Sequence, residues 1–313
     1  MAPLQHMKSS IEHLSERKRE ELLLIQEILF EEFDLAKGRR QKEHDRKGRI
    51  LKIVLFGAHA NEERTKTSDE TKARGRSDFN LLLVVNFEEL TDIATYWRKA
   101  MDRIDHCTSI ETPVSFIIYS LGDVNNNLAH GQRFFNEIVR EGVALYEMPG
   151  QRFVAPKPLN AAEAYEIAKD NYDRWITSAE EFSFYFRDAQ SRRWTGKAAF
   201  FLHQTIETLY TCTLLTLSDH SPFTHNIRLL RSMAEDAAPS LKSAWPDEDR
   251  FQRRCFERLR DAYMKSRYSK HYVIAYDELS WLGERSEILA EIVTALCEDR
   301  VRELDRARYR ESG

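Results

Sequence analysis

Hydrophobic residues recur along the first half of the chain with two different spacings. Across residues 15–33 they fall at helical intervals, which predicts an amphipathic helix. Its apolar face consists of Leu22, Leu23, Ile25, Ile28, Leu29 and Phe33. Residues 50–56 are apolar except for Lys52 and end at Gly57, which predicts a buried strand stopped by a tight turn.

Two more apolar runs indicate further strands, at residues 78–86 and 113–120. A helix is predicted between them, at residues 92–106, and the charged residues 37–49 predict a solvated connection. Residues 61–76 are expected to form a polar loop. The order helix, strand, strand, helix, strand is typical of an α/β or α+β domain with one small sheet, and we expect an α+β domain with a small mixed sheet.

The pattern changes after residue 147, because the next thirteen residues contain three prolines and a glycine. We therefore expect a first domain at 1–147, a linker at 148–160 and a second domain at 161–313. Helical periodicity dominates the second domain and predicts an all-α bundle. The predicted helices cover residues 161–190, 196–218, 226–237, 249–267 and 278–310.

Composition narrows the class of protein. The 313 residues, with 42% hydrophobic and 31% charged, suit two globular cores. No apolar run approaches the roughly 20 residues that span a bilayer, and the first residues lack the apolar stretch of a secretory signal, so we expect a cytoplasmic protein without a membrane partner. The net charge of −4 means that any nucleic-acid site must be local.

Two segments of the first domain contain candidate metal- and phosphate-binding residues. The segment LFGAHA at 55–60 is followed, after the polar loop, by SDFNLLLVV at 77–85. Asp78 and Asn80 stand at positions i and i+2 of a strand and so point to the same side, where paired acidic residues share divalent cations. A turn at Gly57 and Ala58 brings backbone N–H groups near phosphate oxygens.

This pattern resembles the polymerase-beta-type nucleotidyltransferase superfamily, in which a strand ends in Gly-Ser and Asp-x-Asp opens the next strand. The resemblance implies Mg²⁺ at Asp78 and Asn80 and an NTP bound by Gly57, Ala58 and Ser77. It also implies transfer of a nucleotidyl group to a protein or RNA acceptor.

The sequence departs from that pattern. Ala58 replaces the usual Ser, Asn80 replaces the second Asp, and Ser115 stands where a later strand supplies the third carboxylate. Asp123, just past that strand, is a candidate substitute. Two explanations fit Asn80: natural conversion to a binding module, or an Asp-to-Asn substitution made to silence an enzyme.

The second domain resembles HEPN domains through residues 196–215 and 261–274, and the whole layout resembles bacterial fusions of a transferase-like domain with a HEPN domain. HEPN ribonucleases use an Arg, four to six residues, then a His, on a helix that pairs across a dimer. Here only three residues separate Arg267 from His271, one fewer than that pattern requires. If the helix continues, Tyr263, Arg267 and His271 share a face. The resemblance implies a homodimer, and Tyr272 as a possible nucleotidylated residue.

Other polar residues of this domain have simpler explanations. Basic residues such as Arg267 and His271 are favoured at a helix C-terminus, and we expect His203 and Glu207 to be a buried polar pair. A basic and aromatic cluster can bind a nucleic-acid strand or lie at an exposed helix junction. It comprises Arg187, Arg192, Arg193, Trp194 and Lys197.

Three functions remain open. The first is a Mg²⁺-dependent nucleotidyltransferase, which would be inactive if replacement of the second Asp by Asn80 disables it. The second is a dimeric HEPN ribonuclease or RNA-binding toxin, and the third is a non-catalytic interaction or regulatory module. A toxin–antitoxin or phage-defence role is implied by fold analogy alone.

Overall fold

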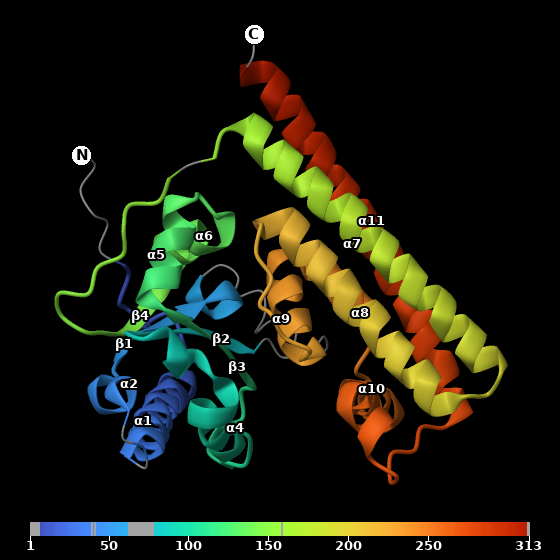
Figure 1. Ribbon diagram of the computed structural model, residues 1–313, viewed down its shortest axis with the longest axis horizontal. Coiled ribbons are helices and arrows are strands. Elements are labelled where there is room, and N and C mark those ends of the chain that lie inside the picture. The colour runs from blue at the N-terminus through green and yellow to red at the C-terminus, as the bar shows by residue number, and fades with distance from the viewer. Residues whose placement is uncertain (1–6, 39, 41, 62–77, 158, 312–313) are drawn as a thin grey trace. The chain divides into compact units, whose positions relative to one another are not determined.

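The computed structural model describes residues 7–38, 40, 42–61, 78–157 and 159–311. These residues form two compact units that divide near residue 158 (Figure 1). We call the described residues up to 157 the sheet unit and residues 159–311 the helical unit. The predicted fold class is confirmed: a small mixed sheet lies in the first unit and the second is all helical.

The sheet has four strands in the order β3-β2-β1-β4. Strand β1 (Ile50–Phe56) pairs antiparallel with β2 (Phe79–Val85) and with β4 (Val143–Glu147). Strand β2 runs parallel to β3 (Val114–Ser120), so the sheet is mixed. The register places Asn80 opposite Phe56 on one side and Ser115 on the other.

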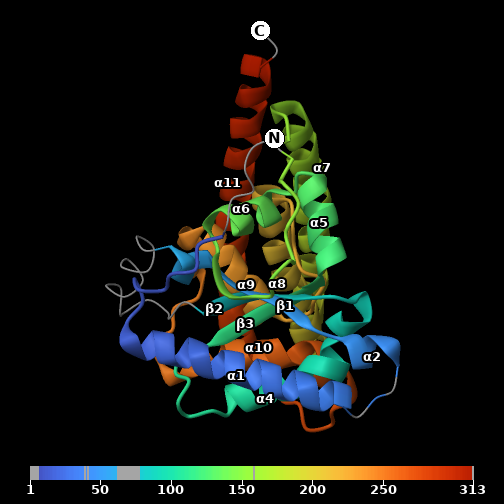
Figure 2. The ribbon, with the colours of Figure 1, turned by 90° about the vertical axis from the view of Figure 1, so that its left-hand side faces the viewer.

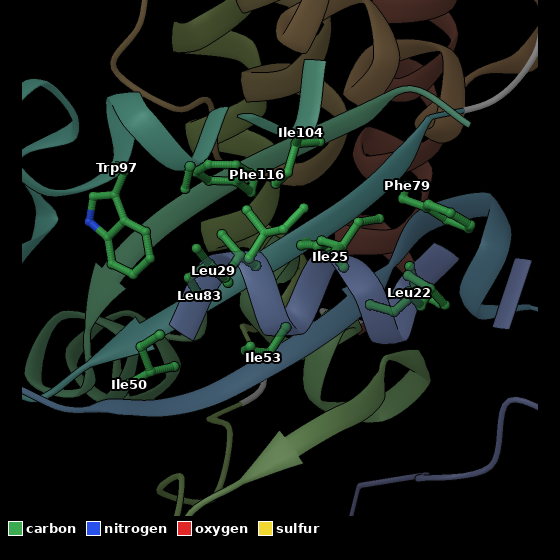
Figure 3. Packing of buried hydrophobic residues seen from close by; sticks show 14 of the residues in the cluster. Leu22, Ile25, Leu29, Ile50, Ile53, Phe79, Leu83, Trp97, Ile104 and Phe116 are labelled. Carbon is green, nitrogen blue, oxygen red and sulfur yellow. The ribbon is translucent and has the colours of Figure 1, made fainter. Parts of the chain in front are cut away.

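Helices cover both faces of this sheet. Helix α1 (Glu16–Gly38) packs Leu22, Ile25 and Leu29 against Ile53 and Leu83 (Figure 3). The π-helical turn η3 (Ile93–Trp97) and α4 (Arg98–Asp105) lie on the same face, as their contacts with α1 show. The opposite face contacts α5 (Leu121–Ala129) and α6 (Arg133–Glu141).

The single charged residue of β1 is buried with the strand. Lys52 is 1% exposed, and its ammonium group pairs with the Glu147 carboxylate on β4 and lies 4.8 Å from the centre of the Phe153 ring. A carboxylate and a ring thus compensate this cation, which explains how a strand with an internal lysine is buried over its whole length.

Two parts of the predicted organisation are wrong or incomplete. Residues 37–49 are not simply a solvated connection, because α2 (Glu43–Lys47) forms there and Asp45, 2% exposed, accepts a hydrogen bond of 2.6 Å from Tyr96. Helices α5 and α6 and strand β4 were not predicted as elements. Each has nine residues or fewer, too few for a clear period.

The helical unit confirms the predicted helices to within about two residues. They are α7 (Ala161–Ser191), α8 (Thr195–Ser218), α9 (Ile227–Ala237), α10 (Arg250–Tyr268) and α11 (Tyr276–Glu311), with the 3-10 turn η4 (Pro239–Ala244) between α9 and α10. Helix α7 begins with a capping box, because Asn160 accepts from the Glu163 N–H and Glu163 from the Asn160 N–H.

Helix α8 is the centre of this unit. It contacts α7, α9, α10 and α11, and α11 also packs along α7, as both ribbon views show (Figure 2). Residues on several sides of α8 are buried, as in a helix enclosed by others. None of the described helices is long and apolar enough to cross a membrane.

Candidate functional site

The first candidate site begins at the turn that ends β1. Gly57 has φ 77°, a left-handed conformation that costs a residue with a Cβ about 1 kcal/mol or more. His59 follows in this turn and is buried, with its ring centre 4.9 Å from that of Phe79. The backbone carbonyl oxygen of His59 accepts a hydrogen bond of 2.9 Å from His13 Nε2. The turn predicted from the glycine is therefore present and fixed on two sides.

Asp78 and Asn80 lie beside this turn, at the start of β2. Asn80 is fully buried and Asp78 is 9% exposed. Ser115 Oγ, on the neighbouring strand β3, donates a hydrogen bond of 3.0 Å to Asp78 Oδ2. The residues that the sequence placed together are thus brought together, and Ser115 holds the position of the third carboxylate as a hydrogen-bond donor.

Asp123 cannot complete this acidic set, so that suggestion is wrong. Strands β2 and β3 are parallel, with Phe79 opposite Val114 and Val85 opposite Ser120. Asp123 follows Ser120 and accepts its hydroxyl hydrogen bond at 2.7 Å, so it lies at the far end of the strand pair. A seven-residue strand separates the two ends by about 20 Å.

The donors near the β2 start do not fit a magnesium site held by the protein alone. Among the described residues, no three His, Cys, Asp or Glu side chains gather as a metal-binding group. Asp78 provides one carboxylate, and magnesium in phosphate-transfer sites usually takes one or two, with water and phosphate as further ligands. Ala58 is buried and offers no hydroxyl, and the predicted nucleotide-binding residue Ser77 lies outside the described residues.

The second candidate site lies in the last turn of α10. The Arg267 guanidinium carbon is 4.4 Å from the centre of the Tyr263 ring, 4.8 Å from Phe200 and 5.1 Å from Tyr268. Its Nε donates to the Tyr263 carbonyl oxygen at 2.8 Å. Among the described residues, the two terminal nitrogens of this exposed side chain have no hydrogen-bond partner. They can therefore bind an anion from solvent.

Helix α10 ends at Tyr268, so the expected helical face of Tyr263, Arg267 and His271 is wrong for its last member. His271 lies in the following turn, exposed, with its backbone N–H bonded to Ser269 Oγ at 3.3 Å. Tyr272 is half-buried and its hydroxyl donates to the Arg258 carbonyl at 3.0 Å. Burial raises the pKa of this phenol. A nucleotidyl transfer to Tyr272 would first have to break this hydrogen bond.

A histidine that the sequence analysis did not single out completes the site. His225, in the connection between α8 and α9, places Nδ1 3.1 Å from both carboxylate oxygens of Glu207. Its Nε2 lies 2.9 Å from the Tyr263 hydroxyl, and the two rings stack with centres 3.9 Å apart. Gln204 also donates to Glu207, at 3.1 Å. Nothing in the spacing of His225 signals this role, because its partners come from other elements.

His203 is buried on α8 and Glu207 is half-buried there, but they are not the closed pair that we expected. Glu207 is bonded to His225 and Gln204, whereas His203 Nδ1 lies 3.6 Å from it. Burial lowers the pKa of His203 to about 3. The charges of His225 and Arg267 act in the same direction and a hydrogen bond with the His225 backbone opposes them, so this imidazole is neutral near pH 7. Burial raises the pKa of Glu207, and the hydrogen bonds from His225 and Gln204 oppose that rise.

The basic and aromatic cluster lies at the turn between α7 and α8. The Arg192 guanidinium is 5.3 Å and the Lys197 ammonium 4.8 Å from the half-exposed Trp194 ring. A Cβ placed on Gly196 would lie 3.8 Å from the carbonyl oxygen of Ser266, so this turn is next to the end of α10 that carries Arg267. Arg187 instead bonds Ser183 Oγ on α7 and does not join the cluster around Trp194.

Comparison with known proteins bears on the helical unit. Residues 172–300 match the family model of the HEPN domain. No curated protein matches the chain. The matched range runs from α7 to α11 and includes Glu207, His225, Tyr263 and Arg267. The sequence resemblance noted for residues 196–215 and 261–274 is thereby confirmed, and the helical unit contains a HEPN domain.

Proposed function

We propose that the HEPN domain of this protein binds RNA and cleaves its phosphodiester backbone, with Arg267 as the phosphate-binding residue. The observation that carries this proposal is the state of the Arg267 side chain. Three aromatic rings and a backbone carbonyl fix its position, while its terminal nitrogens have no hydrogen-bond partner among the described residues. A guanidinium held in this way presents a planar fork that matches two phosphate oxygens.

The surroundings of Arg267 suit a flexible RNA strand. The Trp194 turn adjoins the end of α10, and its exposed ring and basic neighbours can stack on a base and attract a phosphate. The overall charge of −4 would repel RNA elsewhere, so binding depends on this local group of cations. We also propose that the protein acts as a dimer of HEPN domains, which light scattering of the full chain tests.

The test is cleavage of end-labelled single-stranded RNA by the full chain and by Arg267→Ala. We expect about a hundredfold loss of the cleavage rate in Arg267→Ala, the scale of losing one donor to a charged transition state. Arg267→Lys keeps the charge but not the fork and should give an intermediate rate. Arg302→Ala on α11 removes an exposed arginine that pairs with Glu298 and Asp299 and should leave cleavage unchanged. Equal rates for Arg267→Ala and wild type would refute the proposal.

We propose a second function, nucleotide binding by the sheet unit, on a separate observation. Gly57 turns the chain at the end of β1, and the register places Asn80 between Phe56 and Ser115 with Asp78 beside them. Backbone N–H groups at such a turn can bind phosphate, and one carboxylate can help to bind Mg²⁺ with an NTP. Transfer of the nucleotidyl group to a protein or RNA acceptor would then require the missing charge at residue 80.

Radiolabelled ATP with Mg²⁺ tests this second function in wild type, Asn80→Asp and the control Asn126→Asp, which adds the same charge at an exposed position of α5. Label transfer in Asn80→Asp alone would support an intact site that Asn80 silences. Binding of ATP without transfer in every variant would support a regulatory role, and neither binding nor transfer would refute the proposal for ATP.

A further inference from the structure

Three residues of the HEPN domain form one chain of hydrogen bonds that ends beside Arg267. Glu207 on α8 bonds His225 Nδ1 at 3.1 Å, and His225 Nε2 is 2.9 Å from the Tyr263 hydroxyl on α10. Tyr263 in turn holds Arg267, through its carbonyl oxygen and its ring. The chain therefore joins a carboxylate, an imidazole and a phenol to the phosphate-binding group.

The hydrogen-bond partners assign the protons along this chain. The Glu207 carboxylate accepts from Gln204 as well as from His225, so His225 Nδ1 carries a proton and donates it. In the neutral imidazole Nε2 is then an acceptor, and the Tyr263 hydroxyl donates to it. This is the order in which a carboxylate orients an imidazole and the imidazole activates a hydroxyl.

The environment keeps His225 available as a base. Its side chain is 48% exposed and is stacked on Tyr263, whereas Glu207 is only 16% exposed. Glu207 and His203 from α8 and Tyr263 from α10 are the titratable groups near it, and Arg267 lies on the Tyr263 ring beyond. His203 is neutral near pH 7, so Glu207 is the anionic partner that the structure gives His225.

We propose that Tyr263 is the catalytic proton acceptor for RNA cleavage, and that His225 and Glu207 are its positioning residues. This inference rests on the proposed ribonuclease function and assigns the proton transfer to residues other than His271. His271 lies beyond the end of α10, whereas Tyr263 touches Arg267 directly.

The proposed step conserves atoms and charge. The ribose 2′-oxygen attacks the adjacent phosphorus, and the bond from phosphorus to the 5′-oxygen breaks, which leaves a 2′,3′-cyclic phosphate and a 5′-hydroxyl. The 2′-hydroxyl proton passes to the Tyr263 oxygen while Tyr263 gives its own proton to His225 Nε2. The leaving 5′-oxygen takes a proton from water, and the hydroxide that forms is neutralised by the proton that His225 then releases.

The experiment measures kcat, KM and RNA binding for the full chain and for Tyr263→Phe, Glu207→Gln and His271→Ala. Tyr263→Phe keeps the ring that stacks on His225 and Arg267, so we expect kcat to fall about a hundredfold with RNA binding nearly unchanged. Glu207→Gln should lower kcat and leave KM nearly unchanged, because the amide no longer holds His225 in the tautomer whose Nε2 accepts from the Tyr263 hydroxyl. His271→Ala should keep most of the wild-type kcat.

The possible results separate this inference from the proposed function. A wild-type chain that cleaves RNA, together with a Tyr263→Phe variant of equal kcat, overturns the assignment of Tyr263 alone. Loss of cleavage in His271→Ala with normal kcat in Tyr263→Phe overturns it in favour of His271. A wild-type dimer that leaves every RNA intact overturns the ribonuclease function itself and this inference with it. Thermal unfolding of each variant identifies a loss that comes from misfolding.

Discussion

The sheet unit and the helical unit both bring polar residues from separate elements to one place, but the two groups differ in chemistry. At the start of β2, Asp78 bonds the Ser115 hydroxyl and Asn80 is fully buried. At the end of α10, Arg267 contacts Tyr263, whose phenol is linked by hydrogen bonds to an imidazole and, through it, to a carboxylate. The first group has one charge, whereas the second has a cation, an anion and an acid–base pair.

The arrangement of a site and a complete set of reactive groups are therefore separate properties. The sheet unit brings a glycine turn and two strand residues together, as the proposed nucleotide site requires, yet one of the two side chains is an amide. The helical unit lacks the expected helical spacing of its histidine but holds another histidine in contact with the same tyrosine. The predictions below test whether the two sites are independent and how each is stabilised.

The largest expected effect comes from Trp97→Ala in the core of the sheet unit. Trp97 is fully buried, stacks on Phe33 at 4.8 Å between ring centres and donates to the Leu90 carbonyl at 2.7 Å. Its removal should lower the free energy of unfolding of this unit by about 3–5 kcal/mol, measured in urea. The proposed RNA cleavage by the HEPN domain should persist below the urea transition of the sheet unit. Loss of both together would show that the two units are coupled.

Asn80→Asp should be the next largest change. It places a second carboxylate at a fully buried position beside Asp78, which should cost about 3 kcal/mol at pH 7 without metal. The loss should shrink at pH 4, where the added group is protonated, and with Mg²⁺ if the pair binds it. Calorimetry with Asn126→Asp as the exposed control measures this difference. An unchanged melting temperature would mean that solvent reaches residue 80.

The helical unit should be sensitive to acid because of its buried neutral histidines. Burial lowers the pKa of His203 to about 3 and that of His220 to about 4. Below pH 6.5 the unfolded chain therefore binds protons that the folded chain excludes. The free energy of unfolding decreases as the pH is lowered, until the pH reaches the pKa of each histidine in the folded state. From pH 6.5 to pH 5 the loss from His203 approaches about 2 kcal/mol.

His203→Phe tests this acid sensitivity, because phenylalanine cannot titrate. Its urea midpoint should depend less on pH between 6.5 and 5 than that of the wild type, with His220 accounting for part of the remaining slope. His106→Gln, at an exposed position of the sheet unit, should leave the slope unchanged. Parallel slopes for His203→Phe and wild type would argue that His203 is solvated in the native state.

The smallest expected effect is that of Gly57→Ala. At φ 77° the added Cβ should cost about 1 kcal/mol and reduce nucleotide binding by moving the turn. Gly122→Ala is the matched control, because its Cβ would lie 3.6 Å from Ser120 Oγ within helix α5. There alanine should be neutral or slightly stabilising in thermal unfolding. Equal costs at both positions would mean that Gly57 is not restricted by its conformation.

Much of the architecture could be predicted because it depends on local spacing. The long helices from α7 to α11 carry enough turns for a clear period, and β1 and β2 are continuous apolar runs. Elements such as α2, α5 and β4 were not predicted, because each is too short to display a recognisable spacing of hydrophobic residues. The predicted residues Gly57, Asp78 and Asn80 are brought together, whereas their metal and nucleotide stay predictions.

The sequence by itself determined the fold class, the helices of the second half and the resemblance to a HEPN domain. Each depends on residues close together along the chain. Only the tertiary structure decided that α10 ends before His271, that Asp123 lies at the wrong end of β3, and that His225 joins Glu207 to Tyr263. Glu207 and Tyr263 are 18 and 38 residues from His225, and such contacts arise from helix packing rather than local period.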